Sequence, residues 1–256
     1  MRARLYVIPG SHACRCAMLM LAHKGIPYEL RELPTGAHPT IVRLLGFPGH
    51  RAPIRSVDGR THAALGMLDR LGTVPALAFD GERVQTNRRI ARFLDRAQPH
   101  LPLFPADEPA RAAVEEAEAW GDEVLQMAAR RIVMAAAARG AGELHDGGGS
   151  GRLGALLAAS ERVRIFFSRV AGPIVFRADA TGERALLAEL PSMLDRIDRW
   201  IGHGVLGGPD LYAADYMIAP SVALLSYRHD LREEIERRRA GALIDRVLPL
   251  RARARA

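Results

Sequence analysis

The chain has 256 residues, of which 48% are hydrophobic and 25% charged, and its formal net charge is +7. This length and composition are typical of an ordinary folded protein with two modest domains, and no apolar run approaches the roughly 20 residues that cross a bilayer. The positive charge comes almost entirely from arginines scattered among acidic residues, which argues against nucleic acid and membrane surfaces as partners.

The first residues predict a β-α-β unit. Residues 5–8 form a short apolar run that Pro9 and Gly10 end, a pattern typical of a buried strand followed by a turn rather than of a signal peptide. Ser11 is a good N-cap for a helix that ends near Lys24 and Gly25. Residues 28–33 predict the second strand, and we expect a cytoplasmic protein.

A hairpin and a helix follow. Residues 72–79 and 82–84 predict two strands, because Asp80-Gly81 between them is a favoured two-residue turn. Thr86 or Asn87 caps the next helix, which ends before a proline and has an apolar stripe formed by Ile90, Phe93, Leu94 and Ala97. With a further helix allowed in the connection before the hairpin, the first hundred residues predict the order β-α-β-(α)-β-β-α.

The sequence pattern of the second half predicts only helices. A proline-rich linker covers residues 100–109, and the glycine-rich segment 147–151 separates two helices. We expect four helices, marked in turn by Val114 to Ile132, Leu153 to Val170, Leu187 to Ile201 with Pro191 at its start or at a kink, and Met217 to Tyr227. The tail 251–256 is expected to fray. The predicted domains are 1–99 and 107–250.

Five segments together resemble the serine-type cytosolic glutathione transferases, of the theta and zeta kind. The Ser-x-x-Cys motif of this group opens the first helix here as Ser11-His12-Ala13-Cys14, and Lys24 to Glu29 follows at the usual distance. The other similar segments are Gly36-Ala37-His38, Thr73-Val74-Pro75-Ala76-Leu77, and Ala214-Asp215 with Ala219-Pro220. The arginine- and alanine-rich composition is typical of a GC-rich genome, and we interpret the chain as a bacterial member.

This resemblance implies a thioredoxin-like α/β domain followed by an all-helical domain. It also implies a cytoplasmic homodimer that conjugates glutathione, as co-substrate and without a metal, to a hydrophobic electrophile, the chemistry of detoxification. The likeness covers the chain except the stretch 47–71, which we interpret as an insertion that is either a lid or disordered. The electrophile pocket is expected between the domains, with Trp120, Gln126 or Arg130 as candidate contacts.

Ser11 is the residue that the resemblance implies as catalytic. Its hydroxyl, at the positive end of a helix, would donate to the sulfur of the bound thiol and stabilise the thiolate. The alternative is an N-cap without chemistry. Tyr6 is a second candidate, since a tyrosine near the end of the first strand activates the thiol in other branches, but its apolar surroundings favour the core. Cys14 is a third, and would indicate a glutaredoxin-like reductase.

Two cysteines at alternate helix positions support neither a disulfide nor a metal site. Cys14 and Cys16 are the only cysteines, and on a helix they point in different directions. We therefore expect no disulfide and a reducing compartment. His12 precedes them, but the spacing diverges and no fourth ligand is evident, so no metal is predicted.

The remaining candidates bind the ligand. The resemblance implies a cis bond between Val74 and Pro75, which would present the valine backbone to the cysteinyl backbone of the thiol, and His38 as a partner of its glycine carboxylate. Thr86 and Asn87 stand where the family has an acidic residue or Gln, followed by Ser, at the γ-glutamyl end. Since no acid is present at this pair, the ligand is either glutathione or another small thiol. A non-catalytic binding protein of this fold is the alternative function.

Overall fold

The structure, a computed structural model, describes residues 3–8, 11–49, 73–140, 144, 169–170, 172–176 and 178–248. Several predicted features lie outside this part of the chain: most of the stretch 47–71, the glycine-rich segment 147–151, nearly all of the helix marked by Leu153 to Val170, and the tail 251–256. Within the described part, no helix is both long enough and apolar enough to cross a membrane.

The N-terminal part is built on a four-stranded mixed sheet of order β2-β1-β3-β4. β1 (Ala3–Val7) runs parallel to β2 (Tyr28–Glu32) and antiparallel to β3 (Ala76–Phe79), which pairs with β4 (Glu82–Gln85). This order confirms the predicted β-α-β unit followed by a hairpin, and it is the thioredoxin-like arrangement.

The hairpin turn forms for the reason that the sequence suggested. Asp80 and Gly81 have φ angles of 45° and 97°, so both central residues adopt the left-handed conformation that a two-residue hairpin turn requires. Glycine adopts it freely and aspartate better than most residues, which explains why this dipeptide connects β3 to β4.

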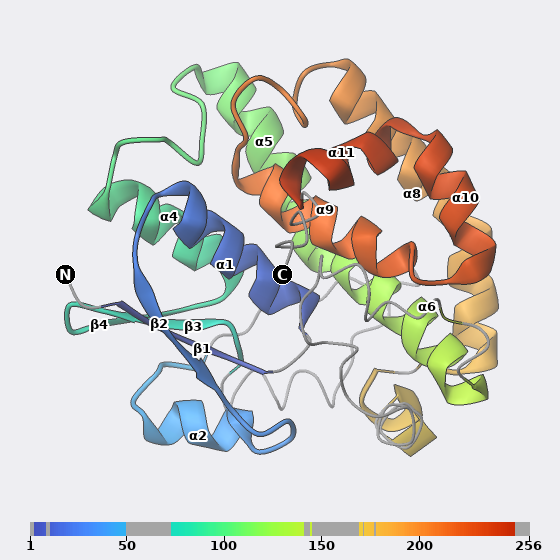
Figure 1. Ribbon diagram of the computed structural model, residues 1–256, viewed down its shortest axis with the longest axis horizontal. Helices are drawn as coiled ribbons and strands as arrows, with labels where there is room; N and C mark the ends of the chain where they lie inside the picture. The colour runs from blue at the N-terminus through green and yellow to red at the C-terminus, as the bar shows by residue number, and fades with distance from the viewer. Residues whose placement is uncertain are drawn as a thin grey trace, which may run out of the picture.

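Helices cover both faces of the sheet (Figure 1). α1 (His12–His23) and α4 (Asn87–Ala97) lie together on one face, and α2 (His38–Leu44) lies on the other. α1 begins at the predicted N-cap Ser11, and its chain turns at Gly25, whose φ is +62°.

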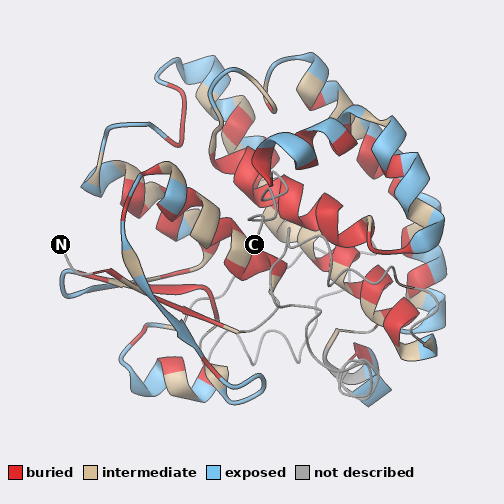
Figure 2. Cartoon of the chain, viewed as in Figure 1, coloured by how far each residue is buried: buried red, intermediate tan, exposed pale blue. Residues whose placement is uncertain are grey.

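The second part of the chain is helical, as predicted (Figure 1). One long rod runs through α5 (Glu108–Trp120), a π-helical turn η1 (Gly121–Leu125) and α6 (Gln126–Arg139). The other elements are η5 (Gly172–Phe176), α8 (Ala180–Gly202), α9 (Ala213–Leu225), α10 (His229–Arg237) and α11 (Arg239–Val247). α9 is buried along its whole length and forms the centre of this part (Figure 2).

Three details differ from the sequence prediction. Pro109 lies in the first turn of α5, where proline is well tolerated, so the linker ends earlier than expected. Pro191 lies inside α8, which begins eleven residues before it because Asp179 accepts hydrogen bonds from the backbone of Thr181 and Gly182. α10 and α11 were not predicted.

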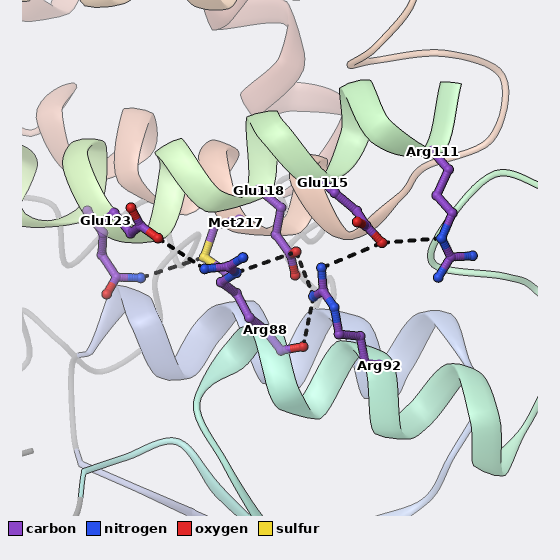
Figure 3. Close-up of polar contacts among 8 residues, drawn as sticks. Arg88, Arg92, Arg111, Glu115, Glu118, Glu123 and Met217 are labelled. Carbon is purple, nitrogen blue, oxygen red and sulfur yellow. Dashed lines mark hydrogen bonds and ion pairs between the residues drawn. The ribbon is translucent and has the colours of Figure 1, made fainter. Parts of the chain in front are cut away.

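A charged network joins the two parts along α4 and α5 (Figure 3). The carboxylate of Glu118, whose side chain is 0% exposed, accepts a hydrogen bond from Arg92 at 2.7 Å and lies 3.9 Å from Arg88. Arg88 also pairs with Glu123 at 3.1 Å, and Arg92 lies 3.7 Å from Glu115. Burial nevertheless raises the pKa of Glu118 to about 7, because desolvation outweighs the attraction of the two arginines.

Candidate active site

Ser11 sits at the positive end of α1. Its backbone is extended, with φ −80° and ψ 114°, and its Oγ accepts a hydrogen bond from the backbone N–H of Cys14 at 3.2 Å. The side chain is therefore an N-cap, as predicted. A serine oxygen that accepts one hydrogen bond still carries a proton, so the cap and the proposed donation to a sulfur are compatible.

The thiol of Cys14 is buried and protonated. The residue is 2% exposed, and burial raises the pKa of its thiol to about 11, although contacts with Ser11 and Ile8 act in the opposite direction. Cys16 is also a free, buried thiol, which donates to the carbonyl of His12 at 3.3 Å. Neither group is the exposed thiolate that a glutaredoxin-like reductase needs.

Tyr6 belongs to the core, as its apolar neighbours predicted. The residue is 8% exposed, and its ring meets Phe47 edge-on at 5.6 Å, beyond the C-terminal end of α2. Its hydroxyl accepts a long hydrogen bond from Arg4 at 3.5 Å. Figure 1 shows α1 and α2 on opposite faces of the sheet. The contact with Phe47, which follows α2, therefore places the Tyr6 ring on the α2 side.

The bond between Val74 and Pro75 is cis, as the resemblance implied. The carbonyl of Pro75 accepts from the backbone N–H of Thr86 at 3.3 Å, which links this loop to the start of α4. The side chain of Gln85 donates to the carbonyl of Thr73 at 2.9 Å on the other side of the loop. These contacts hold the cis-proline loop beside the N-terminus of α4.

Thr86 has a backbone conformation that a β-branched residue seldom adopts. Its φ is +69° and its ψ 144°, and its side chain makes no capping hydrogen bond with α4. Such strain persists only where surrounding contacts impose it, and it gathers at functional sites. The strained residue lies between the cis-proline loop and the first turn of α4, at the predicted ligand-binding position.

The side chain of Asn87, a predicted ligand contact, is bonded within the protein. It is 3% exposed, and its Nδ2 donates to the carbonyl of Ala13 at 2.9 Å. The amide therefore joins the first turn of α4 to the first turn of α1, and this bond uses one of its two N–H donors. Its Oδ1 is buried and has no hydrogen-bond partner among the described residues. Backbone N–H groups at the start of α4 are further donors for an anion.

His38 is the first residue of α2. Its Nδ1 accepts from the backbone N–H of Gly36 at 3.3 Å, and the residue is partly buried. Burial lowers the pKa of His38, and the positive charge of Arg130 lowers it further, so the imidazole is neutral at physiological pH and can offer a hydrogen bond but no charge.

His12 connects α1 to the helical part, a role that the sequence did not predict. It is 3% exposed, and its Nε2 lies 3.2 Å from the carbonyl oxygen of Gln126. Burial is the main reason why its pKa falls to about 3, so the ring is neutral and donates to that carbonyl. This bond ties the first turn of α1 to the helical part. In the described ranges, no three His, Cys, Asp or Glu side chains form a group that could hold a metal ion.

The three candidates for the electrophile pocket point in different directions. The indole of Trp120 packs edge-on against Trp200 of α8, with ring centroids 5.3 Å apart, and so faces α8. The side chain of Gln126 contacts the sulfur of Met217 on α9 at 3.8 Å. The guanidinium carbon of Arg130 lies 5.2 Å from the centroid of the Phe176 ring, and the charge of Arg130 contributes to lowering the pKa of His12, Cys14 and His38.

A mixed four-stranded sheet, a helix N-terminus beside a cis-proline loop, and an all-helical second part define the glutathione transferase architecture. In agreement with this, residues 5–102 match the family model for the glutathione S-transferase N-terminal domain. No curated protein matches the sequence.

Solved glutathione transferases have the same fold over nearly the whole chain. Glutathione transferase F2 from Populus trichocarpa is 13% identical, with a TM-score of 0.62 over 96% of this chain and 92% of that one. The enzyme from Ceriporiopsis subvermispora, in complex with glutathione, is 17% identical, with a TM-score of 0.60 over 100% of both chains. That from Methylobacterium radiotolerans, in complex with glutathione sulfonate, is 19% identical, with a TM-score of 0.56 over 96% and 90%. These likenesses show that the chain has the glutathione transferase fold.

Proposed function

We propose that this protein is a glutathione S-transferase-like enzyme that joins the thiol of glutathione to a hydrophobic electrophile. The observation that carries the proposal is the position of Ser11 in a domain that matches the family model. Its hydroxyl caps α1, and the first turn of this helix is bonded to the start of α4, which the cis-proline loop also contacts. The structural neighbours add support, since two of them contain glutathione or its sulfonate.

Ser11 is the group that we propose activates the thiol. Its hydroxyl donates to the sulfur, and the N-terminus of α1 adds the positive end of a helix dipole. A hydrogen bond to a charged group contributes about 1.5–3 kcal/mol, which corresponds to a fall of about one to two units in the pKa of the thiol. The thiol proton leaves to solvent, the thiolate forms the new S–C bond, and the leaving group takes the electron pair of the bond that breaks.

The other candidate residues position the thiol in this proposal. The backbone of Val74, next to the cis proline, pairs with the cysteinyl backbone, and His38 contacts the glycine end. Thr86, Asn87 and the first N–H groups of α4 hold the γ-glutamyl carboxylate. Binding energy from these contacts brings the sulfur to the electrophile.

Substitution of Ser11 tests the proposal. We expect Ser11→Ala to lower kcat with chlorodinitrobenzene by at least about tenfold, while the KM for glutathione changes little, because the lost bond stabilises the thiolate. Because Ser11→Ala also removes the N-cap, it should lower the free energy of unfolding by about 1 kcal/mol whether or not Ser11 activates the thiol. Ser11→Thr, which keeps both the cap and the donor, is the matched control. Undiminished turnover by a folded Ser11→Ala protein would contradict the assignment.

A second candidate function is a non-catalytic binding protein of the same fold. It is favoured by the bond between Asn87 and Ala13, which engages one N–H of that side chain, and by the absence of an acid at the Thr86–Asn87 pair. Retention on immobilised glutathione, combined with chlorodinitrobenzene turnover, separates the candidates. A protein that is retained without turnover is a binding protein, and one that shows neither is not a glutathione transferase.

A further inference from the structure

β2 forms one edge of the sheet, and its outer side pairs with no strand of the described part of the chain. Just after β2, the backbone N–H of Leu33 donates to the carbonyl of Val7 on β1 at 2.8 Å. In a parallel pair, alternate residues of a strand direct both backbone groups to the same neighbour, so the odd-numbered residues of β2 face β1. The N–H and C=O groups of Tyr28, Leu30 and Glu32 therefore point outward.

The side chains of this edge are exposed and carry both signs of charge. Four of the five residues of β2 are exposed (Figure 2), and Leu30 at the centre is 41% exposed. Glu29 and Arg31 lie on the opposite face from Leu30, because successive side chains of a strand alternate. Glu29 pairs with Arg31 and with Arg4 of β1, the latter at 2.7 Å. With Glu32, the edge has two arginines and two glutamates, so its charges cancel although the whole chain carries +7.

The order of these charges is self-complementary in one antiparallel register. If two copies of β2 pair about a two-fold axis through Leu30, Glu29 of each copy lies opposite Arg31 of the other, and the two Leu30 side chains meet. The outward backbone groups of both strands are then opposite one another, so about six backbone hydrogen bonds can form. An axis one residue away sets Glu29 against Glu29, or Arg31 against Arg31, which is repulsive.

We propose that β2 is a docking edge for a second copy of this chain, with which it forms an antiparallel strand pair centred on Leu30. The two four-stranded sheets then become one continuous sheet, and the same surface serves both copies. Backbone hydrogen bonds supply the attraction, while the charges on either side of Leu30 set the register. Because the paired strands are short, the dimer is expected to be reversible and to depend on concentration. The inference is independent of the proposed function, since the site around Ser11 takes no part in it.

Charge reversal combined with mixing tests this register. Glu29→Arg sets arginine against arginine in a pair of identical copies, and Arg31→Glu sets glutamate against glutamate. In sedimentation velocity at low ionic strength, we expect the wild-type chain to dimerise as its concentration rises, and each variant alone to dimerise at least about tenfold more weakly. An equimolar mixture of the two variants places opposite charges together again, so a mixed dimer should form.

Two further variants separate the edge from net charge and from misfolding. Leu30→Lys sets two ammonium groups against each other at the axis, leaves the ion pairs of Glu29 in place, and should weaken the dimer as well. Glu82→Lys reverses an exposed charge on β4, at the other edge of the sheet, and should leave dimerisation unchanged. Far-UV circular dichroism checks the fold of each variant. A monomeric wild type, a dimer that persists in all three β2 variants, or folded charge-reversal variants that stay monomeric when mixed would overturn the proposal.

Discussion

Glu118 makes the stability of the interface between the two parts depend on pH. Its side chain is 0% exposed, and Arg92 of α4 donates to one of its oxygens at 2.7 Å, while its Oε1 has no partner among the described residues. Burial raises its pKa from 4.5 to about 7. The folded state therefore holds a proton that the unfolded chain has already lost.

The sign and size of the effect follow from linkage. Because the folded pKa is the higher one, the stabilisation is complete below the unfolded value of 4.5 and is lost as the pH rises through about 7. A difference of about 2.5 units corresponds to about 3 kcal/mol for this fully buried group. Glu118→Gln removes the titration, so wild type should exceed the variant in stability by about 3 kcal/mol more at pH 4.5 than at pH 8.

Urea unfolding followed by tryptophan fluorescence measures this difference, since the chain has 2 tryptophans and both lie in the helical part. Glu116→Gln is the matched control on the same helix, because the side chain of Glu116 is 64% exposed and only pairs with Arg196. If wild type instead gains on Glu118→Gln as the pH rises, the attraction of Arg92 outweighs desolvation and the reasoning is wrong.

Two further predictions concern buried groups. Lys24→Met should lower the free energy of unfolding, measured in urea titrations, by about 3–5 kcal/mol. The ammonium of Lys24 donates to Asp95 at 2.6 Å and to two backbone carbonyls, so its loss leaves a partly buried carboxylate without its cation. A loss below about 1 kcal/mol would contradict this prediction. Cys14 and Cys16 should not react with a disulfide reagent at neutral pH until the protein unfolds, since both thiols are buried and the pKa of Cys14 is about 11; rapid labelling of the native protein would restore the reductase interpretation.

Local signals predicted the N-terminal part well. Asp80-Gly81 indicated the hairpin because the turn itself demands positive φ at both residues, and Ser11 indicated the start of α1 because the cap satisfies a backbone donor within the same turn. In both cases the cause lies within four residues of the signal. The order of motifs along the chain then predicted the architecture, which the sheet topology and the fold comparisons confirm.

The features that were missed depend on distant partners. α10 has one fully buried apolar position, Ile235, so its sequence shows little of the periodicity that marks a helix in isolation. The bond of Asn87 to the carbonyl of Ala13 was also missed, because its two partners lie far apart in the chain. The charges of Arg88, Arg92 and Glu118 meet only after α4 packs on α5.

The same long-range contacts decide which part of the site is available for chemistry. Two hydrogen bonds hold the first turn of α1 in place. The side chain of Asn87 joins it to α4, and the ring of His12 joins it to α6. The end of α1 is therefore clamped from two sides, and Ser11 occupies a set position between them. A rigid donor stabilises a developing thiolate without reorganising, which is the condition under which a single hydroxyl is catalytically useful. Removal of either contact, Asn87 to Ala13 or His12 to Gln126, should therefore change kcat more than the KM for glutathione, although neither side chain takes part in the reaction.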